Sequence, residues 1–89
     1  MNKKERDKQR RKTLADNIGR LRYQAGYSQR QLANITGICL STIQRYEWNR
    51  QEPRFTSVCR IAEALHVDIR QLVMTEKEWK VIEEKTHGH

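Results

Sequence analysis

The middle of the chain carries a predicted helix whose outward side chains suit hydrogen bonding to nucleic acid. Ile43 and Tyr46 are the residues that would pin this helix, at about residues 40–48, to a core. Its opposite face is polar apart from its first residue and consists of Leu40, Ser41, Gln44 and Arg45. A DNA major groove about 12 Å wide admits such a helix, and an arginine there binds guanine O6 and N7 together, which is worth roughly 1–3 kcal/mol of discrimination. The chemistry predicted for this face is the reading of DNA bases.

The residue types point to neither catalysis nor a metal. No grouping of serine, cysteine and carboxylate residues suggests an activated nucleophile. The two cysteines and three histidines match no zinc-binding spacing. A chain of 89 residues buries only roughly 60–65% of its unfolded surface, which leaves little room for a substrate cavity. We therefore expect no enzyme activity, no cofactor and no metal.

Short helices joined by tight turns must hold the polar face in place. A first helix over about residues 13–25 is predicted by apolar residues spaced four, three and four apart: Leu14, Ile18, Leu21 and Ala25. Ser28 and Gln31 form a capping box for a second helix, and small Ala33 lets two helices cross closely. Gly37 can adopt the positive φ that reverses the chain in a few residues. This pattern predicts a helix-turn-helix.

The rest of the chain also reads as helix. A polar loop at residues 49–54 holds the only proline, and a fourth helix follows at about residues 56–65. Asp68 caps a short fifth helix, and Thr75 with Glu78 opens a tail helix. We expect an all-α protein with a compact five-helix domain over residues 13–74 and a C-terminal tail helix over residues 75–89.

The N-terminal arm, residues 1–12, concentrates positive charge. It holds seven Lys and Arg residues against two acidic ones, in a chain whose formal net charge is +7. Such an excess suits a polyanion, because each neutralised phosphate releases counterions. The arm either stays disordered and wraps the duplex or extends the first helix, since it contains neither Gly nor Pro.

The sequence predicts a protein of the cytoplasm. No apolar stretch reaches the roughly 18 residues that span a bilayer, and the charged N-terminus has no following apolar segment, as a signal peptide would. Two cysteines are too few for a disulfide framework, so reduced thiols are expected. We expect no contact with a membrane.

Several linked motifs resemble the Cro/C1-type family of helix-turn-helix proteins, the lambda-repressor-like or XRE family. The resemblance runs from Leu14 to Val73. The matching segments are residues 22–29 (RYQAGYSQ), 32–33 (LA), 37–38 (GI), 43–47 (IQRYE), Pro53 and 61–65 (IAEAL). The resemblance implies a lambda-repressor-like domain that binds double-stranded DNA and regulates transcription, in the first place as a repressor acting as a homodimer.

The resemblance also implies roles for individual residues. Leu40, Ser41 and Arg45 match positions that usually contact bases, and Gln44 lies beside them. The residues implied to contact phosphates are Gln29, Arg30, Thr42, Arg50 and Arg54. Arg22 and Glu47 resemble a structural ion pair between the first helix and the end of the third; the alternative is a pair of solvated charges.

The sequence departs from the family pattern at four positions. Leu40 replaces a frequent glutamine and can pack only on a thymine methyl group. Cys39 replaces a Ser or Thr cap with a weaker acceptor. Arg54 replaces a capping serine, so that the cap is expected to move to Thr56. His66 replaces a helix-ending glycine, which predicts either strain or a shifted helix end.

The tail helix leaves its role open. Trp79 and Ile82 either form a dimer seam or fold back over Val73 or Ile69. One alternative function is an antitoxin whose tail helix binds a toxin protein while the helix-turn-helix represses its own operon. Another is a helical adaptor that binds protein and no DNA.

Overall fold

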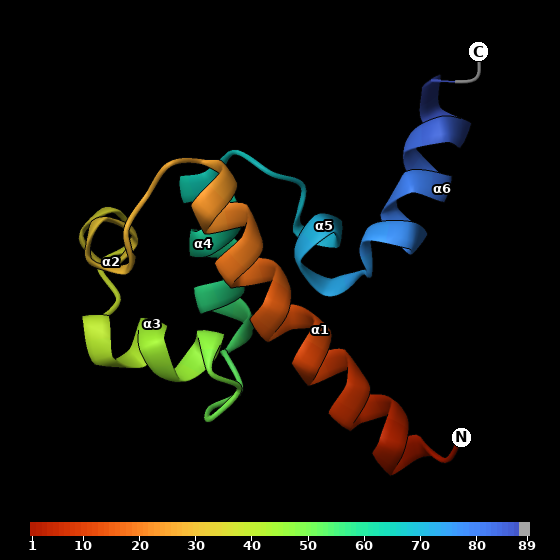
Figure 1. Cartoon of the computed structure of the whole chain (residues 1–89), viewed down its shortest axis with the longest axis horizontal. Coiled ribbons are helices and arrows are strands. Elements are labelled where there is room, and N and C mark those ends of the chain that lie inside the picture. Colours follow the sequence, from red (N-terminus) through yellow and green to blue (C-terminus); the bar gives the residue numbers. More distant parts are fainter. Residues whose placement is uncertain (88–89) are drawn as a thin grey trace.

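The structure, a computed structural model, describes residues 1–87 and is all-helical over that range (Figure 1). The helices are α1 (Lys3–Gln24), α2 (Gln29–Thr36), α3 (Leu40–Glu47), α4 (Phe55–Leu65), α5 (Ile69–Val73) and α6 (Glu76–His87). The predicted all-α class is confirmed, and the last two residues of the predicted tail lie outside the described residues. None of these helices is both long and apolar enough to cross a membrane.

One core joins the first five helices. Its largest fully buried side chains come one from each helix in order: Ile18, Leu32, Ile43, Ile61 and Leu72. Burying a side chain of this size contributes about 1.5–3 kcal/mol, so each helix has its own apolar anchor. Ile43 is the anchor of α3, and it fixes which side of that helix faces outward.

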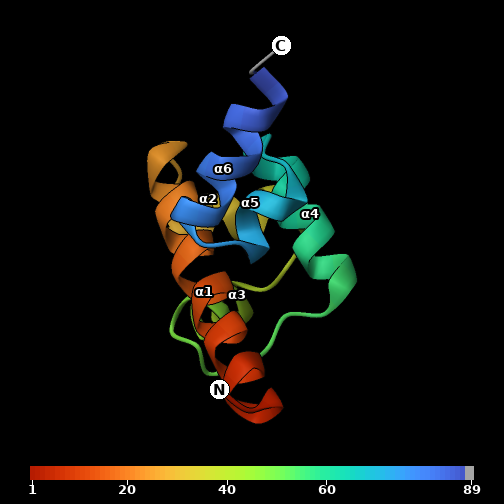
Figure 2. The same ribbon diagram turned by 90° about the vertical axis from the view of Figure 1, so that its right-hand side faces the viewer.

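Helix α1 starts at Lys3, not near residue 13, so the basic arm takes its helical alternative. Asn2 caps the helix by accepting a hydrogen bond of 2.9 Å from the Glu5 backbone N–H. The N-terminal half of α1 extends beyond the other helices at one end of the molecule in both ribbon views (Figures 1 and 2). At the other end of α1, Ala25 is the exposed C-terminal cap and contributes nothing to the predicted apolar stripe.

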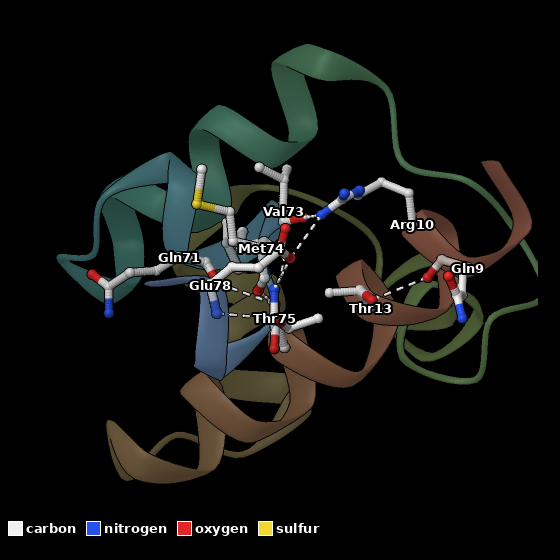
Figure 3. A network of polar contacts seen from close by, with 10 residues as sticks. Gln9, Arg10, Thr13, Gln71, Val73, Met74, Thr75 and Glu78 are labelled. Carbon is white, nitrogen blue, oxygen red and sulfur yellow. Dashed lines mark hydrogen bonds and ion pairs between the residues drawn. The ribbon is translucent and has the colours of Figure 1, made fainter. Parts of the chain in front are cut away.

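A polar network joins α1 to α5 and to the start of α6. Asn17, which is only 5% exposed, donates to the backbone carbonyls of Gln71, Leu72 and Met74 at 3.1, 2.9 and 2.6 Å. Arg10 lies two helical turns before Asn17, and its Nη1 donates to the Val73 carbonyl at 2.8 Å (Figure 3). The carbonyls that α5 leaves without helical partners are therefore satisfied by α1.

Helix α6 begins at a capping box and contacts α5. Thr75 and Glu78 exchange hydrogen bonds of 2.9 and 3.1 Å as predicted, and Arg10 adds an ion pair to Glu78 at 3.2 Å. The donors from the Thr75 backbone and side chain, with Arg10, lower the pKa of Glu78. Trp79 is half-buried with the Arg70 guanidinium 5.4 Å above its ring, so it folds towards α5 and stacks on a cation.

The departures from the family pattern have visible consequences at helix ends. Cys39 and Arg54 are the N-caps of α3 and α4, and neither side chain caps its helix. The predicted shift of the cap to Thr56 is wrong, because α4 already begins at Phe55 and Thr56 lies inside it. His66 ends α4 in the left-handed region, with φ 56°, so the strained alternative is the one observed.

Candidate DNA-binding surface

The turn between α2 and α3 is built from local hydrogen bonds. The capping box at the start of α2 has both predicted bonds, between Ser28 and Gln31, at 2.7 and 3.0 Å. Gly37 ends the helix with φ 75°, and its N–H donates to the Ala33 carbonyl at 2.9 Å. The buried Thr36 hydroxyl then accepts from the Ile38 N–H at 3.2 Å across the turn. The short turn thus sets the angle at which α3 leaves α2.

Helix α3 presents Ser41 and Arg45 to solvent. Ile43 is fully buried and Tyr46 is 3% exposed, so the opposite side of the helix is free. Gln44 is half-buried. Leu40, which was also expected on the outward face, is half-buried and packs against the core, so that it is only partly exposed. The reason is its apolar side chain, which lies at the start of α3 where the core is within reach.

A nearly buried ion pair fixes the end of α3 against α1. Arg22 donates to Glu47 through Nε at 2.7 Å and Nη2 at 3.0 Å, and the two side chains are 16% and 8% exposed. Arg22 Nη1 also donates to the Tyr27 carbonyl at 2.7 Å, and Gln29 adds a bond of 3.2 Å to Glu47. Gly19 leaves room for this carboxylate, because a Cβ there would lie 3.2 Å from Glu47 Oε1 and the carboxylate would have to shift by a few tenths of an ångström.

The residues implied to contact phosphates lie at three places. Arg30 is exposed on α2, while Gln29 beside it is half-buried and already donates to Glu47. Thr42 is half-buried on α3. The loop after α3 carries two exposed arginines, Arg50 and Arg54. Arg30, Arg50 and Arg54 are therefore free to meet a polyanion, whereas Gln29 also has a structural role.

The sequence matches a family model that corresponds to the helix-turn-helix seen in the structure. A family model described as helix-turn-helix covers residues 18–72 of the chain. The chain belongs to the Cro/C1-type helix-turn-helix family.

A solved structure of similar fold carries a related description. It is the crystal structure of a hypothetical transcription factor, NHTF, from Neisseria, which is 27% identical to this chain with a TM-score of 0.76. The match covers 82% of this chain and 84% of the other. No curated protein matches the sequence.

The sequence analysis did not predict a role for Trp48, at the end of the helix-turn-helix. Trp48 is 61% exposed at the C-terminal cap of α3, and with Arg45 and Arg50 it lines an open hollow of about 730 Å³. A hollow lined by an aromatic ring and two arginines has the composition of surfaces on which nucleic-acid bases stack. The sequence carries no specific signal for this position, because single exposed apolar residues are common on protein surfaces.

The sequence analysis also missed two residues through which α1 contacts the rest of the domain. Asn17 and Gly19 both lie on α1, and each acts on a partner more than 25 residues away in the sequence. A glycine inside a helix is unfavourable by about 1 kcal/mol, which was the available signal for close packing at Gly19, whereas nothing in the local sequence indicates the partners of Asn17. Among the described residues, no three His, Cys, Asp or Glu side chains gather in a group that would hold a metal ion.

Proposed function

We propose that this protein is a transcriptional repressor that binds double-stranded operator DNA as a homodimer, with α3 in the major groove. The observation that carries the proposal is the outward edge of α3. Ser41 and Arg45 are exposed there, while Ile43, Tyr46 and Glu47 hold the other side of the helix. A rigidly held helix keeps its side chains in register with base edges.

The base contacts are assigned to Ser41, Gln44 and Arg45, with Leu40 limited to packing on a thymine methyl group. Arg45 is the strongest reader, because its guanidinium can bind guanine in two places at once. Arg30, Arg50 and Arg54 are assigned to phosphates, where they fix register and carry no sequence information. Glu47 and Arg22 are assigned no DNA contact.

The length of α3 supports a dimer. Eight residues form a helix about 12 Å long, which spans roughly four base pairs of groove. A site of that length recurs too often to select one operator. Two copies related by a two-fold axis place two such helices about 34–36 Å apart, on half-sites one helical turn apart. Repression then follows where the operator overlaps a promoter and the dimer excludes polymerase.

The test begins with selection of bound duplexes from a random pool, which reports palindromy and half-site spacing. Arg45→Ala is then compared with the unaltered protein on the selected operator and on random duplexes. We expect the operator affinity to fall about 5- to 150-fold, from a loss of roughly 1–3 kcal/mol, with a much smaller loss on random DNA. Arg60→Ala is the matched control, because Arg60 is an exposed arginine on α4 beside Tyr27 and His66.

Two outcomes contradict the proposal. Equal losses on both duplexes for Arg45→Ala would reduce that residue to a phosphate contact. Failure of the unaltered protein to bind any duplex with salt dependence would favour the protein-binding adaptor. The sign of regulation is measured separately, with a reporter gene whose promoter overlaps the selected operator, and increased expression would refute repression.

A further inference from the structure

Three basic residues near the start of α1 lie on the side of that helix that faces α3. This side is identified by Gly19 and Arg22, which both approach Glu47 of α3. Positions that repeat every three or four residues share one side of a helix. Counting back from Arg22 through Gly19 gives residues 15, 11, 8 and 4, so the same side continues as Lys4, Lys8 and Arg11. We call these three residues the basic row.

The basic row runs beside the loop that follows α3. Lys8 lines a hollow of about 280 Å³ together with Asn49, the first residue of that loop. Arg11 lines a second hollow of about 200 Å³ with Glu52, which lies further along the same loop. The N-terminal half of α1 then continues past α3 and the loop (Figures 1 and 2). The row therefore extends the surface formed by α3 and its loop.

The charge of the row is available to an external anion. All three side chains belong to exposed residues, and over residues 1–87 the structure records no ion pair for any of them. Their neighbours differ: Lys12 is bound to Asp16 at 2.8 Å, and Arg10 is bound to Glu78. The acidic groups near the row are Glu5 and Asp7 on α1 and Glu52 on the loop, each of them exposed.

We propose that the basic row is a second phosphate-binding surface, which holds the DNA backbone next to the groove that α3 enters. The proposal rests on the proposed function, since it takes the DNA to be placed by α3. Residues 4 to 11 rise about 10 Å along the helix axis, enough to meet two or three successive phosphates. The row borders the loop that also carries the exposed Arg50 and Arg54, and this extended positive charge favours DNA over an acidic protein. Because the row is on a helix, it adds these contacts without the cost of ordering a flexible arm.

The test compares two charge-matched pairs of substitutions on the same helix. Lys8→Gln with Arg11→Gln removes two charges from the row, whereas Lys3→Gln with Arg6→Gln removes two charges of α1 that lie outside the row. Glutamine has nearly the helix propensity of lysine and arginine, so α1 is preserved, and circular dichroism checks this. Affinity for the selected operator and for random duplexes is measured between 50 and 200 mM salt.

The row variant should flatten the slope of log affinity against log salt by about 2, because each phosphate contact contributes about 0.9. At 50 mM salt the row variant should lose affinity for the operator and for random duplexes by the same factor. Trimming the duplex beside the α3 site should remove the difference in affinity between the row variant and the unaltered protein. Equal slopes for the two variants would overturn the row while leaving the proposed function intact, provided that Arg45→Ala still loses operator preference. Absence of duplex binding by the unaltered protein would instead overturn the proposed function.

Discussion

Removal of the Arg22 guanidinium tests whether the contact between α1 and α3 holds the fold. Arg22→Met keeps an apolar stem and leaves the Glu47 carboxylate, which is 8% exposed, with Gln29 as its remaining donor. Loss of one partner from a buried ion pair typically costs about 3–5 kcal/mol. Because Arg22 is itself 16% exposed and Gln29 stays bound, we expect a loss just below this range, about 2–3 kcal/mol.

The assay is urea unfolding monitored by circular dichroism. It is applied to the unaltered protein, to Arg22→Met, to Glu47→Leu and to the double variant, which together form a double-mutant cycle. With an m-value of about 1–1.5 kcal/mol/M, the expected loss lowers the unfolding midpoint by about 2 M. The double variant should recover most of the free energy of unfolding that Arg22→Met loses, since an apolar pair of similar volume is often as stable as a buried ion pair. The coupling energy should be about 2 kcal/mol.

The control is an ion pair that differs mainly in exposure. Lys12 and Asp16 meet at 2.8 Å, but their side chains are 67% and 63% exposed. Lys12→Met should therefore change the free energy of unfolding by less than about 0.5 kcal/mol. If Arg22→Met costs no more than Lys12→Met, or if the coupling energy is near zero, then Arg22 and Glu47 are two solvated charges and the reasoning fails.

Three further predictions concern the supports of the domain. Asn17→Leu should lower the free energy of unfolding in urea by about 2–3 kcal/mol, because it leaves buried carbonyls at the end of α5 without donors. A loss below about 1 kcal/mol would contradict this capping role. His66→Gly should raise the free energy of unfolding by about 0.5–1 kcal/mol by relieving the left-handed residue, whereas His66→Ala should not. Hydrogen bonds from the Arg70 side chain and backbone lower the pKa of Asp68 from 3.8 to about 2, so stability that is present above about pH 4 should be lost as the pH falls towards 2. An Asp68→Asn variant should lose less over the same range, and equal pH profiles would refute that contribution.

The parts of the fold that follow from neighbouring residues were predictable. The capping boxes at Ser28 and Thr75 and the reversal at Gly37 each depend on a few residues in sequence, and all three occur. The burial of Ile43 and Tyr46 followed from helical periodicity. These patterns were enough to predict which side of α3 faces outward, which is the larger part of the candidate site.

The parts that depend on distant residues were not predictable. The contact of α1 with the end of α5 depends on the bond from Arg10 to Val73, which joins residues 63 positions apart. The half-burial of Leu40 depends on where the core lies relative to the start of α3. The exposure of Trp48 depends on the direction in which the chain leaves α3, and helical periodicity says nothing about a residue at the cap.

Helix α1 therefore helps to position the outward edge of α3 that carries Ser41 and Arg45, although that edge lies on another helix. Glu47 is the last residue of α3, two positions after Arg45, and it is bound from α1 by Arg22 and from α2 by Gln29. A shift of Glu47 relative to α1 turns α3 about its buried anchor Ile43 and moves Arg45 with it. A displacement of about 1 Å is enough to break a two-point contact with a base, because each hydrogen bond tolerates only a few tenths of an ångström. Under the proposed function, base reading by Arg45 therefore depends on how firmly Arg22 and Gln29 hold Glu47, although none of these three residues is assigned a base contact.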